Sequence, residues 1–206
     1  MLTLGADTGF MAKKNDGIPA WMTAQALVIK AKNVLTEAAI DLLYKEIEAK
    51  RMSISGTFMP IELEKSGEME QGLFLIRHLM EERANLEASF GRFIEMAEKD
   101  TKRFDATAMK RVEEAKKFLV AVATIDTLTK YGMVFDEWFE DVSSLVNEKD
   151  PAEVIAKTAG DVKSHRAEAL DYLVSSKLFR EEGLFTTEER DILSKTRKIV
   201  AEQNRE

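Results

Sequence analysis

Chain breakers are scarce in this sequence, and that scarcity limits the folds it can adopt more than any other feature. Its 206 residues include only 10 Gly and 3 Pro. A protein built from many strands needs frequent turns containing Gly or Pro, whereas a few long helices do not. Charged residues make up 33% of the chain, above the roughly 25% of ordinary globular domains, as helices with solvated outer faces require. The sequence therefore predicts an all-α protein.

Apolar periodicity and capping residues divide the chain into about six predicted helices. Apolar residues recur every three or four positions, which places them on one face of each helix. Pro19, Ser66, Asp105, Asp150 and Thr186 mark the predicted starts, as first-turn or capping residues. The predicted ranges are 19–51, 67 to beyond Ala97, 105–131, 136–146, 151–182 and 187–201. We expect an irregular helical bundle with a long N-terminal amphipathic helix.

The domain organisation follows from where this pattern is interrupted. Residues 1–17 contain Gly and Asp without helical periodicity, so we expect a flexible N-terminal tail. Residues 18–206 contain no repeat and no low-complexity linker, and we predict a single all-α domain. The turn at 146–151 is the candidate seam, so a division into two domains stays open.

The first predicted helix is about 50 Å long at about 1.5 Å per residue, and its apolar stripe is narrow and rich in Ala. Such a stripe lets another helix approach closely. We therefore expect self-association, or binding of a partner helix, through Leu35 and Leu42. Phe58, in the connector that follows, and Trp138, in the short fourth helix, are the other apolar side chains that we expect at exposed contacts.

The two histidines of the chain have the spacing of metal ligands. His78 is followed three residues later by Glu81, and His165 by Glu168. Side chains three apart share one helix face and can share a metal. At about 100° per residue, however, Glu81 lies about 160° from the centre of its apolar face and Glu168 about 120° from its own. A metal site using His78, His165 and Glu168 is therefore the minor hypothesis.

An acid in the most apolar part of the chain calls for a partner. Asp126 falls on the face predicted from Val112, Ala115, Leu119 and Ala123. A buried carboxylate must be paired or neutral. Arg83, Lys130 and a tyrosine hydroxyl are the candidate partners, and Arg83 is favoured because it lies about 40° from the centre of its own apolar stripe. We predict a buried polar pair between Arg83 and Asp126.

The sequence lacks the residues that several classes of activity require. The absence of Cys excludes disulfides, thiolate zinc sites and Cys nucleophiles, and it fits a reducing, cytoplasmic compartment. The sequence has neither a Gly-x-x-x-x-Gly-Lys loop nor a Gly-x-Gly-x-x-Gly turn, and it has no Gly-x-Ser-x-Gly elbow. We therefore predict no catalytic residue and no cofactor.

Charge and hydropathy bear on the remaining partners. The net charge of −7 disfavours nucleic acid, and the basic residues near Lys110 and Lys116 are interrupted by Glu113 and Glu114. No 18 residues are continuously apolar, so we expect no transmembrane segment. The sequence thus favours a non-enzymatic interaction or scaffolding protein that binds protein partners and forms homo-oligomers through its first helix. Two alternatives stay open: a helical-bundle metal-binding protein or oxidoreductase, and a nucleic-acid-binding helical protein.

Overall fold

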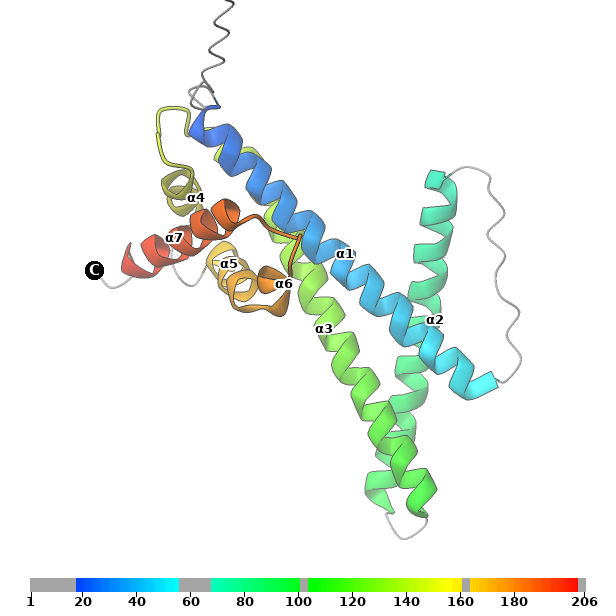
Figure 1. Cartoon of the computed structure of the whole chain (residues 1–206). Helices are drawn as coiled ribbons and strands as arrows, with labels where there is room; N and C mark the ends of the chain where they lie inside the picture. The colour runs from blue at the N-terminus through cyan, green and yellow to red at the C-terminus, as the bar shows by residue number, and fades with distance from the viewer. Residues whose placement is uncertain (1–17, 56–67, 101–103, 161–163, 204–206) are drawn as a thin grey trace, which may run out of the picture.

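The computed structural model describes residues 18–55, 68–100, 104–160 and 164–203, with the backbone alone for residues 48, 50–55 and 68–80. This part of the chain is all-α, which confirms the predicted fold class (Figure 1). It contains seven helices and no strand. They are α1 (Ala20–Ser55), α2 (Glu68–Lys99), α3 (Ala106–Val142), α4 (Pro151–Ala159), α5 (His165–Ser175), α6 (Lys177–Arg180) and α7 (Thr187–Gln203).

Three long helices form the body, and four short helices gather at one end of it. Helix α1 lies along α3, and α2 packs on α3 from another side (Figure 1). Lys32 of α1 pairs with Asp136 of α3, while Thr36 lies beside Gly132, so α1 and α3 run antiparallel. Helices α4 and α5 contact the last turns of α3, and α7 packs on both of them. The beginning of α1 and the end of α3 therefore carry the C-terminal helices.

The predicted end of a helix at Tyr131, before Gly132, is wrong, because α3 continues to Val142 and includes residues 136–142 of the helix predicted at 136–146. Gly132 is buried against α1, and a Cβ atom there would lie 2.9 Å from Oγ1 of Thr36. The glycine is needed for the close approach of two helices. Sequence alone does not separate this use of glycine from a helix cap.

The single helix predicted at 151–182 is also wrong, since three helices occupy this range. Gly160 has a φ of 77°, which ends α4. Ser164 then caps α5 and Ser176 caps α6, each accepting a hydrogen bond from a backbone N–H three residues on. Serine at these positions satisfies N–H groups that a new helix leaves free, and this makes the breaks stable.

Three predicted helix starts are confirmed. The carboxylate of Asp105 accepts a hydrogen bond from the N–H of Ala108 at 2.7 Å, and that of Asp150 accepts from Ala152 at 2.9 Å. Thr186 and Glu189 form a reciprocal capping box, in which each side chain accepts from the other residue's N–H, at 3.2 and 2.7 Å. The predicted cap Ser66 lies outside the described residues.

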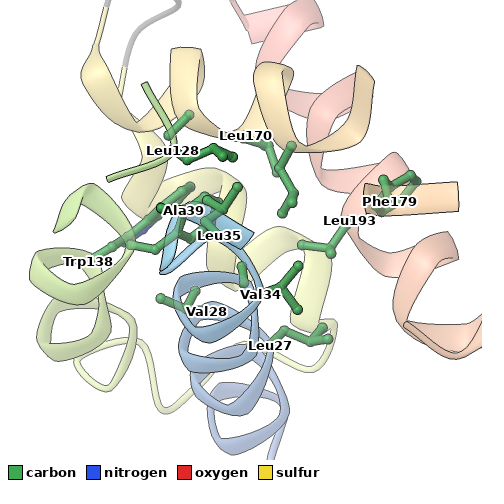
Figure 2. Close-up of a cluster of buried hydrophobic side chains, with 14 of the residues drawn as sticks. Leu27, Val28, Val34, Leu35, Ala39, Leu128, Trp138, Leu170, Phe179 and Leu193 are labelled. Atoms are coloured by element: carbon green, nitrogen blue, oxygen red, sulfur yellow. The ribbon is translucent and has the colours of Figure 1, made fainter. Parts of the chain in front are cut away.

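The Ala-rich stripe of α1 is buried inside the chain. Ala24, Val28, Ala31, Leu35 and Ala39 are 5% exposed or less, and the buried face continues through Leu43 and Ile47. Leu35, Ala39 and Leu128 meet in the interior shown in Figure 2, together with side chains from the C-terminal helices. One core cluster draws residues from all seven helices. This cluster contains residues from both sides of the 146–151 turn. The single domain, with a candidate seam at that turn, stays a prediction.

Helix α3 is central but not buried all round. Its buried face passes through Phe118, Val122 and Ile125, whereas Val120 is 68% exposed and Met133 is 61% exposed. Within the described residues, α3 is also the one helix long and apolar enough to cross a membrane, with a mean hydropathy of 1.4 over its most apolar window and 33% of that window buried. A core helix of a soluble protein passes the same test. The expected absence of a transmembrane segment stays a prediction.

The contact at Gly132 can be tested against a second helical glycine. Gly91 of α2 has no atom within 4 Å of the place its Cβ would take. Gly91→Ala should raise the free energy of unfolding by about 0.5–1 kcal/mol, because Ala loses less backbone entropy in a helix. Gly132→Ala should instead lower it by about 1 kcal/mol, since overpacking against Thr36 outweighs that gain. Urea denaturation followed by circular dichroism measures both.

A variant at the facing position is the control. In a Thr36→Ala background the obstructing Oγ1 atom is gone, so Gly132→Ala should no longer destabilise. If Gly132→Ala is as stabilising as Gly91→Ala with Thr36 present, the close contact between α1 and α3 is wrong.

Candidate interaction surface

The second of the predicted metal pairs lies at the surface. Nδ1 of His165 is 3.6 Å from Oε2 of Glu168, and the two side chains are 73% and 43% exposed, in the first turn of α5. In the part of the chain whose side chains are described, no group of three His, Cys, Asp or Glu residues could hold a metal ion. The backbone of His78 lies in α2, and its side chain is outside the described residues. His165 and Glu168 therefore have no third ligand in the described structure.

Arg83 and Asp126 do form the predicted ion pair, at 2.7 Å between Nη2 and Oδ1. The expectation that both are buried is wrong for the acid: the side chain of Arg83 is 14% exposed, but that of Asp126 is 59% exposed. The buried face of α3 passes through Ile125 instead. A helix that is apolar on most sides does not reveal from sequence which side its neighbours cover.

Two of the four predicted contact residues are inside the protein. Leu35 and Trp138 are each 0% exposed, so the prediction that they lie at an exposed contact is corrected. Leu35 packs in the core between α1 and α3, and the intramolecular partner of the α1 stripe is therefore α3 itself. Phe58 lies outside the described residues. Leu42 remains, half-buried at the edge of the core.

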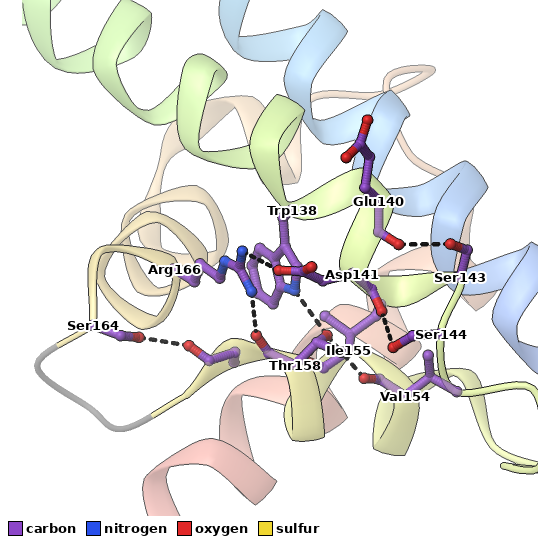
Figure 3. A network of polar contacts seen from close by, with 11 residues as sticks. Trp138, Glu140, Asp141, Ser143, Ser144, Val154, Ile155, Thr158, Ser164 and Arg166 are labelled. Carbon is purple, nitrogen blue, oxygen red and sulfur yellow. Dashed lines mark hydrogen bonds and ion pairs between the residues drawn. The ribbon is translucent and has the colours of Figure 1, made fainter.

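Trp138 is the centre of a polar network that joins three helices (Figure 3). Its indole N–H donates to Oγ1 of Thr158 in α4 at 2.8 Å. The guanidinium of Arg166 in α5 lies 5.9 Å from the ring centroid, donates to the carbonyl of Thr158 at 2.9 Å and pairs with Asp141 of α3. A buried indole N–H needs an acceptor, and Thr158 supplies it. Trp138 of the predicted fourth helix thus joins α3 to α4 and α5.

Leu42 lines a groove where α1 passes α6, and we call this the α1–α6 groove. Its volume is about 320 Å³. The apolar part of the lining comes from both elements. Buried Val34 and half-buried Ala38 and Leu42 belong to α1. Half-buried Leu178 lies in α6, and half-buried Leu184 lies in the turn after α6. Glu37, Asp41 and Lys45 of α1, and Glu181 beyond α6, complete the lining.

Two exposed apolar side chains stand on the same outward side of α1. Ile40 is 38% exposed and Tyr44 is 48% exposed, one helical turn apart. At about 100° per residue, both flank Glu37 and Asp41 on the side away from the α1–α6 groove. The sequence alone indicates this exposed pair in part, because Ile40 and Tyr44 are four residues apart and lie off the Ala-rich stripe. Leu178 and Leu184 could not be found in this way, since only the tertiary fold brings them to α1.

A second, larger groove separates α5 from α7, with a volume of about 690 Å³. Leu170, Val174 and Val200 are among the apolar residues that line it. Its charges are already balanced: Asp171 and Arg197 form an ion pair across it at 2.5 Å, and Glu168 and Lys198 add one charge of each sign. Nothing in this lining selects the charge of an occupant.

Ion pairs attach α7 to the rest of the protein. Lys195 of α7 hydrogen-bonds Asp150, and this bond, with the N–H groups of Ala152 and Glu153, holds the pKa of the Asp150 carboxyl below its usual value despite partial burial. In the first turn of α7, burial would raise the pKa of Glu189. The bonds from Lys30 of α1, at 2.7 Å, and from Thr186 outweigh burial and lower that pKa.

The chain matches no family model, no curated protein and no solved structure. Its surface chemistry is therefore the basis for any functional proposal.

The two lowered pKa values predict the direction of acid sensitivity. In the unfolded chain the carboxyls take up protons near their ordinary pKa values of 3.8 for Asp150 and 4.5 for Glu189, whereas the folded protein takes them up at lower pH. The stabilisation is complete above these values and is lost as the pH falls through the folded pKa values. The double variant Lys30→Gln/Lys195→Gln should thus lose less stability than the wild type between about pH 6 and pH 3.

Urea denaturation at several pH values measures this difference. A matched control is Lys45→Gln/Lys110→Gln, which removes the same charge at two lysines without an ion pair in the described structure. Equal acid sensitivity of the Lys30→Gln/Lys195→Gln variant and the wild type would contradict the assigned pairs.

Proposed function

We propose that the protein is a non-enzymatic interaction module whose contact surface is the outward side of α1 together with the α1–α6 groove. The observations that carry the proposal are the α1–α6 groove with its apolar floor and the exposed Ile40 and Tyr44, which lie about 110° round the same long helix from it. Apolar surface of this kind gains about 25 cal/mol for each Å² that a partner removes from water. A groove along a helix is suited to a second helix laid beside it.

The assignment to binding also rests on what the charged groups do. The two carboxyls with lowered pKa values, Asp150 and Glu189, each cap a helix and pair with a lysine. Their chemistry is thus explained by holding the fold. The proposed partner is a protein, and a second copy of this chain is the first partner to test.

The surface that we propose differs from the one that the sequence favoured. The Ala-rich stripe with Leu35 is covered by α3, so a partner has to use the outward side of α1 and the edge of the stripe at Ala38 and Leu42, which lines the groove. Leu42 belongs to both descriptions, because it lies at the border between the core and the groove.

Exposed residues provide a test that should spare the fold. Ile40→Glu/Tyr44→Glu places two charges on the proposed surface and should lower the free energy of unfolding by about 1 kcal/mol per site, because each side chain is about half-buried, and circular dichroism confirms that the variant is folded. Val120→Glu/Met133→Glu makes the same change on α3, at side chains that are still more exposed. Sedimentation velocity over a range of concentrations measures self-association, and affinity purification from the native host identifies other partners.

The α1 variant should lose the association, with Kd raised at least tenfold, which corresponds to about 1.4 kcal/mol. The α3 variant should keep it. The proposal fails if the α1 variant behaves as the wild type in both measurements, or if the α3 variant alone loses its partners.

A further inference from the structure

The α1–α6 groove differs from the other helix contacts in how its charges are arranged. At the contacts of the C-terminal helices, an acid on one helix meets a base on another: Asp141 with Arg166, Asp171 with Arg197, and Glu189 with Lys30. In the groove, acids come from both walls, Glu37 and Asp41 from α1 and Glu181 from beyond α6. Lys45 is the one base in the lining.

These three carboxylates have no partner of their own. In the described part of the chain, the side chains of Glu37, Asp41 and Glu181 take part in no hydrogen bond and no ion pair. Glu37 and Asp41 are four residues apart, and like charges at this spacing destabilise a helix by a few tenths of a kcal/mol. Glu181 adds a third negative charge across the groove. Lys45, four residues after Asp41, offsets part of this repulsion, and the three carboxylates and one ammonium of the lining leave a net charge of −2, which favours a cationic occupant.

The apolar part of the groove determines the shape of what can enter. Val34, Ala38 and Leu42 follow one another at intervals of four residues, so the floor extends about 12 Å along α1 at about 1.5 Å per residue. That length accommodates two turns of another helix. The small side chain of Ala38, in the middle, leaves room between the leucines for apolar side chains of the occupant.

We propose that the α1–α6 groove binds a basic amphipathic helix of a partner protein. Apolar side chains of that helix, at positions i, i+3 or i+4 and i+7, fill the groove between Ala38, Leu178 and Leu184. Its lysines and arginines lie over Glu37, Asp41 and Glu181. This inference rests on the proposed function and adds the chemistry of the partner.

The charge pattern also distinguishes this groove from the larger one between α5 and α7. There, Asp171 and Arg197 already neutralise each other, and the other two charges are of opposite sign. A basic helix would gain no net attraction. The unpaired carboxylates of the α1–α6 groove, with an apolar floor between them, favour one sign of charge and one kind of surface.

A pair of designed peptides tests the proposal on the full-length protein. Each is about five helical turns long and carries Leu along one face. One has Lys on the opposite face, and the other has Glu at the same positions. Fluorescence anisotropy of labelled peptide gives Kd at about 0.05 M and about 0.3 M salt, because screening should weaken a charged contact. The Lys peptide should bind at least tenfold more tightly than the Glu peptide, and more weakly at the higher salt.

Charge reversal in the groove should remove this preference. Glu37→Lys/Asp41→Lys should raise Kd for the Lys peptide at least tenfold. Glu137→Lys/Glu140→Lys is the matched control, since it makes the same change in net charge at two exposed acids of α3. It should leave Kd within about twofold of the wild type. Circular dichroism confirms that both variants are folded.

The outcomes separate this inference from the proposed function. Equal binding of both peptides, lost in Ile40→Glu/Tyr44→Glu, would overturn the basic partner and leave the interaction surface supported. The inference would be overturned if the groove variant and the control variant raised Kd for the Lys peptide equally, or if the Lys peptide did not bind. The proposed function would still be tested separately by sedimentation and affinity purification. Self-association that excludes the peptide and disappears in Glu37→Lys/Asp41→Lys would replace the partner helix by a second copy, which also overturns it.

Discussion

The close contact between α1 and α3 is the constraint on which the rest of the structure depends. It is made possible by Gly132, which lets α1 approach α3 at Thr36 where a larger residue would meet Oγ1 of the threonine. The pairing buries the Ala-rich stripe of α1 and leaves α2 to cover another side of α3. It also brings the start of α1 beside the end of α3, where α4, α5 and α7 assemble. Because α3 covers the stripe, the outward side of α1 is the one left for other proteins.

The C-terminal helices are attached by paired polar groups, and this explains why the groove stands out. Trp138, Thr158 and Arg166 connect α3, α4 and α5. Lys30 of α1 binds Glu189 in the first turn of α7, and Lys195 in the middle of α7 binds Asp150, the cap of α4. Single exposed ion pairs contribute about 0–1 kcal/mol each, so their main effect is to set which helix packs where. Charged groups without an ion pair also lie elsewhere in the described part of the chain, Lys110 and Glu137 among them, but in the α1–α6 groove three such carboxylates line an apolar floor. The groove and the exposed apolar side chains on the outward side of α1 define the proposed contact surface.

Individual residues show where inference from sequence succeeds. The caps Asp105, Asp150 and Thr186 were predictable because a cap depends on residues three positions apart in the chain. The Arg83–Asp126 pair was predictable as a pair, since each lies near an apolar face, but the exposure of Asp126 depends on which side of α3 its neighbours cover. Trp138 was expected at the surface because it was assigned to a separate short helix, after the helix predicted to end at Tyr131. Once Gly132 is a packing residue and α3 is continuous, Trp138 points into the core.

The sequence by itself determined the all-α class, the long first helix, its buried stripe and most of the helix starts, because each depends on local periodicity or on a cap within one turn. Only the tertiary structure decided that α3 covers the stripe, that Gly132 permits contact instead of ending a helix, and that Leu178 and Leu184 meet Leu42. These facts depend on residues far apart in the chain, where many pairings have similar local preferences and the packing of whole helices selects among them. The candidate site is of this second kind, since its two walls come from the N-terminal and C-terminal parts of the chain.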